Sequence, residues 1–514
     1  MALPGRSAPR KHPLRAPLRA LKRRSRQAST AKADAAHRLL GAFGKRVLQE
    51  HEAIMRRAVR RGVYAGCAST VIHRGEAVFQ KGFGCGDLEK GKAFRHDTIC
   101  RIYCQTKSYT IFVANVLADR GLLDLDAPVS RYIPSMKQMT VLGSSDGGPA
   151  RPARTTMLVR HLLSHAAGFS YQADFNFPPE GAQRRYEELS SGVEGGRIRS
   201  LEQYVDELAK LPLCYEPGDR YEYGHSIDVL GRVMEVACGQ DLRTVMQEEL
   251  FKPLGMVDTD FHVSQSKLER LGGLYGNATT WGHLYGAKVK RGMVPVASKP
   301  GLLRIDGVQA RESAWCKDRV RVLSGGGFLG HNRGGLVSTA RDTEAFVRML
   351  LRRGLAPDGT RLVSSSTLAR MEKNQLVGEW RPPSSSENAG SRWCMLGDMI
   401  RDSVSVYYQQ GGAAGNYWLL DRRRDLAIIF FSQQVDGEDW NELGFDESKA
   451  DISQAMKTIL DSPKTLPALR RSQKSSSDGT SPRAQAERQK GFFEATSPKA
   501  KLARRAGGSK RPVS

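Results

Sequence analysis

A cysteine and a lysine stand three residues apart in the segment RIYCQTK, residues 101–107, directly before the apolar run SYTIFVANVLADR at 108–120. The run is apolar enough to form a buried helix, so Cys104 would lie at the helix start and Lys107 one turn further along the same face. A nucleophile at a helix start gains from the positive end of the helix dipole, and a lysine one turn away can accept its proton. The spacing therefore predicts attack of a side chain on an acyl carbon.

Such a pair is weak support by itself, because Ser264-Gln265-Ser266-Lys267 has the same spacing and is interpreted as the start of a surface helix. What distinguishes the pair at Cys104 is a set of further segments in a fixed order: GLLDLDAPVSRYIP (121–134), LVRHLLSHAAGF (158–169), YEYGHSIDVLGRVMEVACG (221–239), FKPLGMVDTDF (251–261), GGLVSTARDTEAFVRML (334–350) and QGGAAGNYWLLD (410–421). Together with RIYCQTK they resemble the family of class C beta-lactamases, penicillin-binding peptidases and related esterases and transesterases. The resemblance covers residues 46–460.

The resemblance implies a beta-lactamase/transpeptidase-like α+β fold. An antiparallel sheet would be formed from the N- and C-terminal segments, flanked by helices, with a mainly helical inserted subdomain. The chain itself agrees: residues 46–62 have helical periodicity, and two β-rich segments meet at the turn 73–76. Residues 226–239 predict a helix ending at Gly239. Ser338 is expected to cap a helix over 338–353.

Near its C-terminal end the domain should close with strands and one helix. SVSVYYQ, YWLLD and LAIIFFSQ predict adjacent antiparallel strands, and residues 447–460 predict the closing helix. Residues 270–325 have weak periodicity and read as loops, which leaves open whether they form a lid.

The resemblance also implies roles for individual residues. Cys104 takes the place of the nucleophilic serine, Lys107 matches the lysine that assists proton transfer, and Tyr223 matches the tyrosine that acts as general base or acid. Backbone N–H groups of Cys104 and Ala413 would form the oxyanion hole. His165 lies in a turn motif whose role is more structural than catalytic.

Substrate-binding positions follow from the third element of the family, which this chain carries as Gln410-Gly411-Gly412, and from His225. Classical members have Asn at the position of His225, and a basic or aromatic residue at that of Gln410. Both departures fit the esterase and transesterase branch, whose SIDVLG phrase is present at 226–231. Without a cation in the third element, recognition of a lactam carboxylate is not expected.

Cys104 itself allows two interpretations. A thiol beside Lys107 at a helix start should have a lowered pKa and attack an activated ester or thioester. However, a thiolate–ammonium pair leaves Lys107 unable to act as a base, and sulfur is larger than oxygen. The leading hypothesis is a hydrolase or acyltransferase acting on a small ester, thioester or amide. The alternative is a catalytically inactive pseudoenzyme that binds a ligand or partner.

The basic charge of the chain lies in its ends. Of the net charge of +25, residues 1–33 and 462–514 contribute +10 each. Residues 1–45 and 462–514 are therefore predicted to be disordered tails around a domain at 46–461, which gives no reason to expect nucleic-acid binding. The N-terminal composition also fits an organelle transit peptide, although Pro4, Pro9, Pro13 and Pro17 oppose an amphipathic helix. A third hypothesis is that the tails anchor the protein to an acidic surface.

The remaining composition predicts an intracellular protein, cytoplasmic or organellar, without a transmembrane segment or secretory signal. The eight cysteines contain no CxxC pair, so they read as reduced thiols. We expect no metal and no cofactor, because the spacing of Cys85, Cys100, Cys104 and His165 follows no known ligand pattern. The sequence does not determine the oligomeric state.

Overall fold

The computed structural model describes residues 44–143, 149–171, 188–189, 191–193, 195–276, 294–295, 303–304, 322–327, 335–375, 392–435 and 456–462. All of them belong to one compact unit, residues 1–466. Both basic tails, most of the proposed lid at 270–325 and the first part of the helix predicted at 447–460 lie outside the described residues; within the described part, residues 456–460 are helical.

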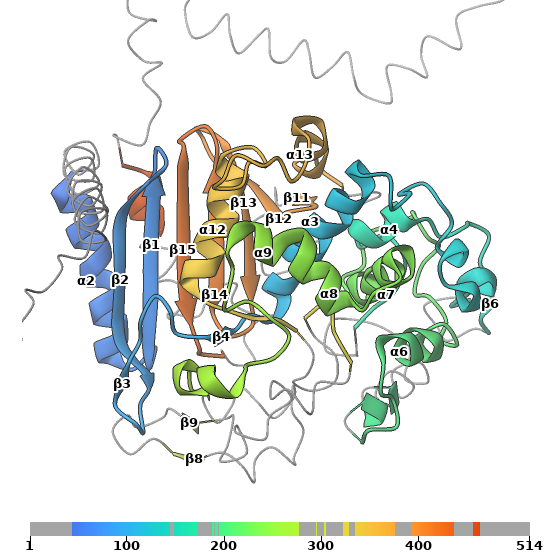
Figure 1. Cartoon of the computed structure of the whole chain (residues 1–514), viewed down its shortest axis with the longest axis horizontal. Helices are drawn as coiled ribbons and strands as arrows, with labels where there is room; N and C mark the ends of the chain where they lie inside the picture. Colours follow the sequence, from blue (N-terminus) through green and yellow to red (C-terminus); the bar gives the residue numbers. More distant parts are fainter. Residues whose placement is uncertain are drawn as a thin grey trace, which may run out of the picture. The chain divides into compact units, whose positions relative to one another are not determined.

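An antiparallel sheet joins the two ends of the domain (Figure 1). Its strand order is β11-β12-β13-β14-β15-β1-β2-β3. The strands are β1 (Gly66–His73), β2 (Glu76–Asp87), β3 (Lys92–Ala93), β11 (Arg392–Cys394), β12 (Gly397–Arg401), β13 (Val406–Gly412), β14 (Asn416–Asp421) and β15 (Leu426–Ser432). Strand β1 pairs along its length with β15, from Cys67 opposite Ser432 to His73 opposite Leu426. The predicted sheet of N- and C-terminal segments is thereby confirmed.

Helices cover both faces of this sheet. Helix α2 (Lys45–Arg61) and residues 456–460 pack on one face, in an apolar cluster that includes Ile428 and Phe430 of β15. On the other face, α12 (Ala340–Leu351) and the buried helix α3 (Thr106–Asp119) share a core with Trp418 of β14. The apolar alternation along β14 and β15 therefore serves two cores at once.

A mainly helical subdomain lies beside α3, as predicted (Figure 1). Helix α7 (Ser226–Cys238) is its centre and contacts α3, α4, α6 and α8. The other helices are α4 (Val159–Leu163), α6 (Leu201–Leu208), α8 (Leu242–Met246), α9 (Lys252–Leu254) and, nearer the sheet, α13 (Ser365–Met371). Short strands complete the frame: β4 (Cys100–Arg101), β5 (Thr140–Val141), β6 (Arg151–Pro152), β7 (Tyr275–Gly276), β8 (Val294–Pro295), β9 (Leu303–Arg304) and β10 (Val337–Ser338).

Local signals in the sequence placed several element ends correctly. The β1–β2 hairpin turns at Arg74 and Gly75, with φ of 52° and 76°. Helix α7 ends at Gly239 with φ of 64°, the left-handed conformation that glycine adopts without penalty. The predicted cap of α12 was wrong: Thr339 accepts the hydrogen bond from the Asp342 amide, whereas Ser338 still belongs to β10.

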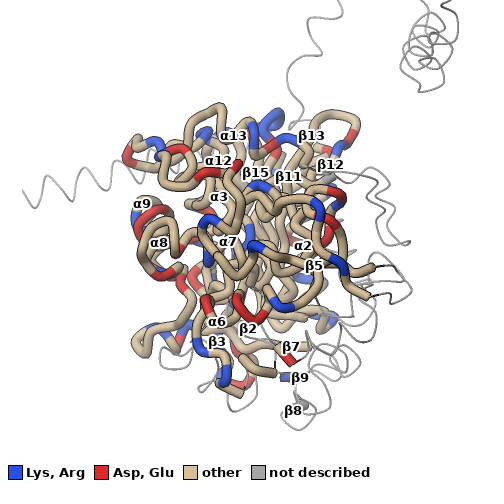
Figure 2. Tube along the Cα trace, turned by 90° about the vertical axis from the view of Figure 1, so that its right-hand side faces the viewer, with Lys and Arg blue, Asp and Glu red and all other residues tan. Residues whose placement is uncertain are grey.

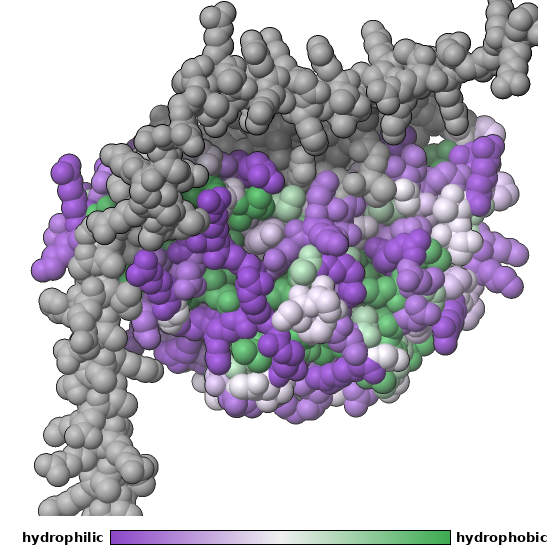
Figure 3. All heavy atoms as spheres, turned by 90° about the horizontal axis from the view of Figure 1, so that it is seen from above, coloured by the Kyte–Doolittle hydropathy of each residue, from purple (hydrophilic) through white to green (hydrophobic). Residues whose placement is uncertain are grey.

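Lys and Arg are interspersed with Asp and Glu along the described trace (Figure 2). On the face seen from above, hydrophilic residues predominate and apolar ones form small, scattered patches (Figure 3). Among the described helices, none combines the length and apolar character needed to cross a membrane.

The cap of α12 offers a stability test. We expect Thr339→Ala to lower the free energy of unfolding by about 1 kcal/mol, because the Asp342 amide loses its acceptor. Thr339→Ser keeps a hydroxyl at this position and should stay close to the wild type. Chemical denaturation of the three proteins measures both effects, and equal losses for alanine and serine would contradict the assignment of the cap.

Candidate active site

Cys104 lies in a single 3₁₀ turn, Tyr103–Gln105, that runs directly into α3. Tyr103, immediately before it, has φ of 43°. A non-glycine residue in this region stores about 1–3 kcal/mol of backbone strain and persists only where its surroundings hold it. The surroundings do so, since the Ile102 amide donates to Leu336 O (3.1 Å) and the Gln105 amide donates to Ile102 O (3.0 Å).

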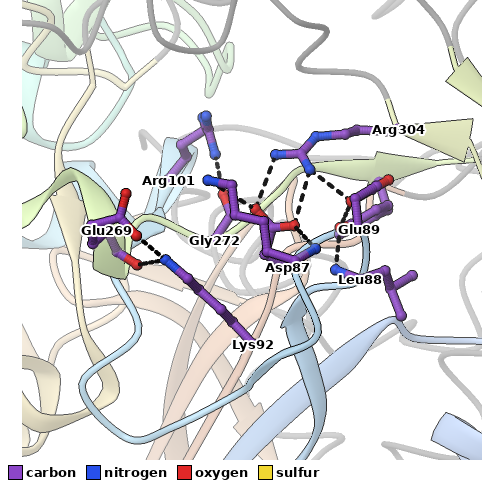
Figure 4. A network of polar contacts seen from close by, with 10 residues as sticks. Asp87, Leu88, Glu89, Lys92, Arg101, Glu269, Gly272 and Arg304 are labelled. Carbon is purple, nitrogen blue, oxygen red and sulfur yellow. Dashed lines mark hydrogen bonds and ion pairs between the residues drawn. The ribbon is translucent and has the colours of Figure 1, made fainter.

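Arg101 fixes the strand that leads into this turn (Figure 4). Its buried guanidinium donates through Nη1 to Gly272 O at 2.8 Å, and its amide donates to Gln433 Oε1 at 3.0 Å. Around it, Arg304 pairs with Asp87, and Lys92 pairs with Glu269. These contacts tie the β2–β3 hairpin to the chain near Gly272. The backbone before Cys104 is therefore held from two directions.

Two glycines allow other segments to approach the turn closely. A Cβ on Gly412 would stand 2.1 Å from Ile102 O, and a Cβ on Gly327 would stand 2.0 Å from Tyr103 O. No side chain fits at such distances. The end of β13, with Ala413 next to it, therefore lies against the Cys104 turn on one side, and residues 324–327 lie against it on the other.

Lys107 is fully buried one turn into α3. Its Nζ donates to Gly326 O at 2.5 Å and lies 4.6 Å from the centre of the Tyr223 ring. Burial lowers the pKa of Lys107, while a hydrogen bond and charge interaction with Cys104 and the charge of Asp228 oppose this shift. Because desolvation is the largest of these effects, the ammonium form is less favoured than in water, and the amine can accept a proton at a lower pH than an exposed lysine does.

Tyr223 completes the group around the thiol. Its hydroxyl is hydrogen-bonded to Cys104, and burial together with the charge of Cys104 raises the pKa of Tyr223 well above its usual value. The phenol therefore stays protonated and can donate a proton. His165 packs against the Tyr223 ring, with centroids 4.9 Å apart. Burial and the neighbouring Lys107 lower the pKa of His165 far below 6.5, so its imidazole is neutral and acts on the position of Tyr223.

Asp228 is a part of the site that sequence reasoning missed. Its Oδ1 accepts from Ser324 Oγ at 2.6 Å and from the Gly326 amide at 3.0 Å. Gly326 is the residue whose carbonyl holds Lys107. A buried acid in the apolar phrase SIDVLG, together with the glycine run that follows Ser324, was the available signal in the sequence.

Two residues predicted to bind substrate, His225 and Gln410, make their described contacts with residues other than Cys104. His225 is buried against the Tyr171 ring, and its Nδ1 lies 3.3 Å from Asp228 Oδ2. Gln410 donates to its neighbour Gly411 O at 3.1 Å, and its Oε1 stands 2.9 Å from the position of a Cβ on Gly397. Lys107 and Tyr223 thus lie together beside Cys104, whereas His225 contacts Asp228, and the Gln410 side chain, which comes from β13, lies against Gly397 of β12.

Comparison with known proteins shows where such a site occurs. The family model described as Beta-lactamase matches residues 51–447. Esterase EstB of Burkholderia gladioli is 32% identical over 213 residues, which are 41% of this chain and 50% of the esterase. Monacolin J acid methylbutanoyltransferase of Aspergillus terreus is 35% identical over 173 residues, 33% of this chain and 39% of that enzyme. The chain therefore spans half or less of these two enzymes.

The fold has the same relatives. The solved structure of EstCE1, described as a hydrolase with promiscuous acyltransferase activity, superimposes with a TM-score of 0.59 at 22% identity. The match covers 80% of this chain and 98% of EstCE1. The beta-lactamase/transpeptidase-like fold predicted from the sequence is confirmed.

Lys107 should set the pH dependence of thiol acylation. Below its lowered pKa the amine is protonated and accepts no proton, so the rate of Cys104 acylation should rise with pH and level off below about 10, the ordinary lysine range. Lys107→Met should slow acylation and move this rise to higher pH, where the thiol ionises without help from the amine. Peptide mass spectrometry after timed exposure to p-nitrophenyl acetate measures the rate; an unchanged rate and pH profile in Lys107→Met would contradict the assignment.

Asp228 should act through Lys107. We expect Asp228→Asn to slow Cys104 acylation by roughly tenfold and to move the pH at which the rate levels off, because the Gly326 carbonyl loses its anchor. The exposed turn residue Asp425, whose backbone conformation asparagine also tolerates, provides the matched control Asp425→Asn. An unchanged pH profile in a folded Asp228→Asn protein would exclude this positioning role.

Proposed function

The chain belongs to the beta-lactamase family, and on this premise we propose that it is an acyl hydrolase or acyltransferase acting on a small ester, thioester or amide through a covalent acyl-enzyme. Cys104 is the nucleophile in the place of the family's serine, and Lys107 and Tyr223 move the protons. The observation that carries the proposal is that Lys107 and Tyr223 lie side by side next to the same thiol: Lys107 Nζ is 4.6 Å from the centre of the Tyr223 ring, and Cys104 influences the pKa of both groups.

Acylation follows from the protonation states of these groups. The neutral Lys107 amine takes the proton of the Cys104 thiol, and the thiolate attacks the acyl carbon. The carbonyl oxygen becomes an oxyanion, which the N–H groups of Cys104 and Ala413 stabilise. The approach of Gly412 to within van der Waals reach of the turn supports this pairing of amides. Tyr223 then donates its proton to the leaving group, as the thioester forms.

Burial removes the difficulty that a thiolate–ammonium pair raises for a cysteine nucleophile. Such a pair would keep Lys107 charged, but desolvation lowers the pKa of the amine, which weakens its hold on the proton. Lys107 then passes this proton to the Tyr223 oxygen, which has given its own proton to the leaving group. In the second step the incoming nucleophile gives its proton to the Lys107 amine, and Cys104 takes that proton as it leaves. Attack by water on the thioester gives hydrolysis, and attack by an alcohol, amine or thiol gives acyl transfer.

The third element does not favour an anionic acyl group. Gln410 supplies no positive charge at the third element, and we propose that Gly411 and Gly412 contribute backbone to the substrate-binding edge of β13 beside it. His225 is proposed to act from behind the pocket, through its contact with Asp228. Recognition of a lactam carboxylate lacks a cationic partner here. The relatives named above, an esterase and an acyltransferase, support the same choice.

A chromogenic ester and an acyl probe test the proposal together. We expect the purified protein to release p-nitrophenol from p-nitrophenyl butyrate, and mass spectrometry to find the butyryl group on Cys104. Cys104→Ala should abolish both signals, while Cys104→Ser reports whether the scaffold still activates a hydroxyl. An unlabelled Cys104 without turnover would contradict the proposal and favour the pseudoenzyme, and labelling at Cys85 or Cys238 alone would do the same.

A further inference from the structure

A carboxylate that the proposed chemistry does not use stands beside the aromatic wall of the site. Asp398 in β12 lies directly opposite Trp393 in β11. Residues directly opposite in an antiparallel pair carry their side chains on one face, with Cβ atoms about 4.5–5.5 Å apart. The Trp393 ring in turn contacts those of Tyr221 (5.5 Å) and Tyr223 (6.3 Å). The Trp393 ring therefore connects Asp398 with Tyr223, the tyrosine beside Cys104.

Tyr221 links this carboxylate to Cys104. Burial raises the pKa of Tyr221, and the negative charges of Asp398 and Cys104 both raise it further. Because both charges affect the Tyr221 hydroxyl, Tyr221 lies near Asp398 and near Cys104. Tyr221 therefore lies between Cys104 and Asp398, where its ring contacts that of Trp393.

Asp398 is oriented, but it is not neutralised. Gln409 lies opposite it in β13 and hydrogen-bonds to it, and the Tyr417 hydroxyl donates to Gln409 Oε1. Burial raises the pKa of Asp398 to about 6, so the carboxylate is ionised at neutral pH. In the described part of the chain, the group that offsets this burial is the Gln409 amide and not a cationic side chain. Asp398 is half-buried, so a cationic ligand that reaches it would meet a carboxylate that is already oriented.

The combination of a fixed carboxylate with the faces of tyrosine and tryptophan is suited to a positive charge. We propose that Asp398, Tyr221 and Trp393 form a subsite for the ammonium group of a cationic acyl substrate. The inference rests on the proposed function and names its substrate class: a small ester, thioester or amide that carries a positive charge on the far side from the carbonyl. The neutral imidazole of His165 adds no repulsion beside it.

Two thioesters of the same shape test the charge alone. Acetylthiocholine carries a quaternary ammonium group where 3,3-dimethylbutyl thioacetate carries a neutral tert-butyl group. We expect Cys104 of the wild type to be acetylated about tenfold faster by the cationic thioester, a preference of the size that a carboxylate and aromatic faces give. The rates are read from the mass of the Cys104 peptide after timed reaction and quenching.

Asp398→Asn should reduce this preference to about twofold, because the remaining rings give only the cation–π part. Asp425→Asn, an exposed acid in the β14–β15 turn, should keep the full preference. Thermal unfolding shows whether the variants are folded; if Asp398→Asn is not, the wild-type ratio decides, together with Trp393→Leu, which should lower it.

The outcomes separate this inference from the proposed function. Equal acetylation of the wild type by both thioesters, or an undiminished preference in folded Asp398→Asn, overturns the cation subsite while acyl chemistry at Cys104 stands. If neither thioester acetylates Cys104, the proposed function fails, and the subsite fails with it.

Discussion

Burial of the Lys107 amine against a peptide carbonyl is the interaction on which the geometry of the site depends. Removing a lysine charge from water is unfavourable, and this burial lowers the pKa of Lys107 although Cys104 and Asp228 act in the opposite direction. A buried amine also requires an acceptor for its N–H groups, and Gly326 O provides one. Gly326 must then be held in turn, which explains why Asp228 of α7 binds both its amide and the neighbouring Ser324 hydroxyl. The hydrogen bonds that hold the Lys107 amine thus connect α3, α7 and residues 324–327.

The turn at Cys104 is also held by close contacts from distant segments. Tyr103 adopts a left-handed conformation that its own side chain disfavours, so the strain is balanced by contacts from distant segments. Asn416 Nδ2 donates to Arg101 O at 2.5 Å, and glycines at 327 and 412 admit two backbones at distances that no Cβ permits. The sheet therefore does more than support helices, because the end of β13 forms one wall of the reacting centre.

The family resemblance predicted the overall fold, including the sheet that joins the two ends of the domain, and the residue patterns predicted local features. The Cys104–Lys107 spacing, the turn at Arg74-Gly75 and the end of α7 at Gly239 all follow from neighbours a few residues apart. The cap of α12 was misplaced by one residue because β10 ends at Ser338, and the pairing of β10 with β4 is a long-range contact that periodicity does not show.

Asp228 and Asp398 were missed for a related reason. The phrase SIDVLG places Asp228 on α7, but its meaning comes from Ser324 and Gly326, nearly one hundred positions away along the chain. Asp398 gains its setting from Trp393 and Gln409 across the strands and from Tyr221, which arrives from another part of the fold. The family resemblance supplied the groups that touch the thiol, and it said nothing about the groups that hold them.

The pairing of β1 with β15 also decides when the nucleophile can become reactive during synthesis. Cys104 leaves the ribosome early, but its base is oriented by residues 324–327, and its second amide follows β13. Contacts of such large sequence separation form late and slowly in folding. A nascent or truncated chain that ends before β13 therefore carries an ordinary, unactivated thiol. On the proposed function, Cys104 would gain its reactivity only in the finished fold.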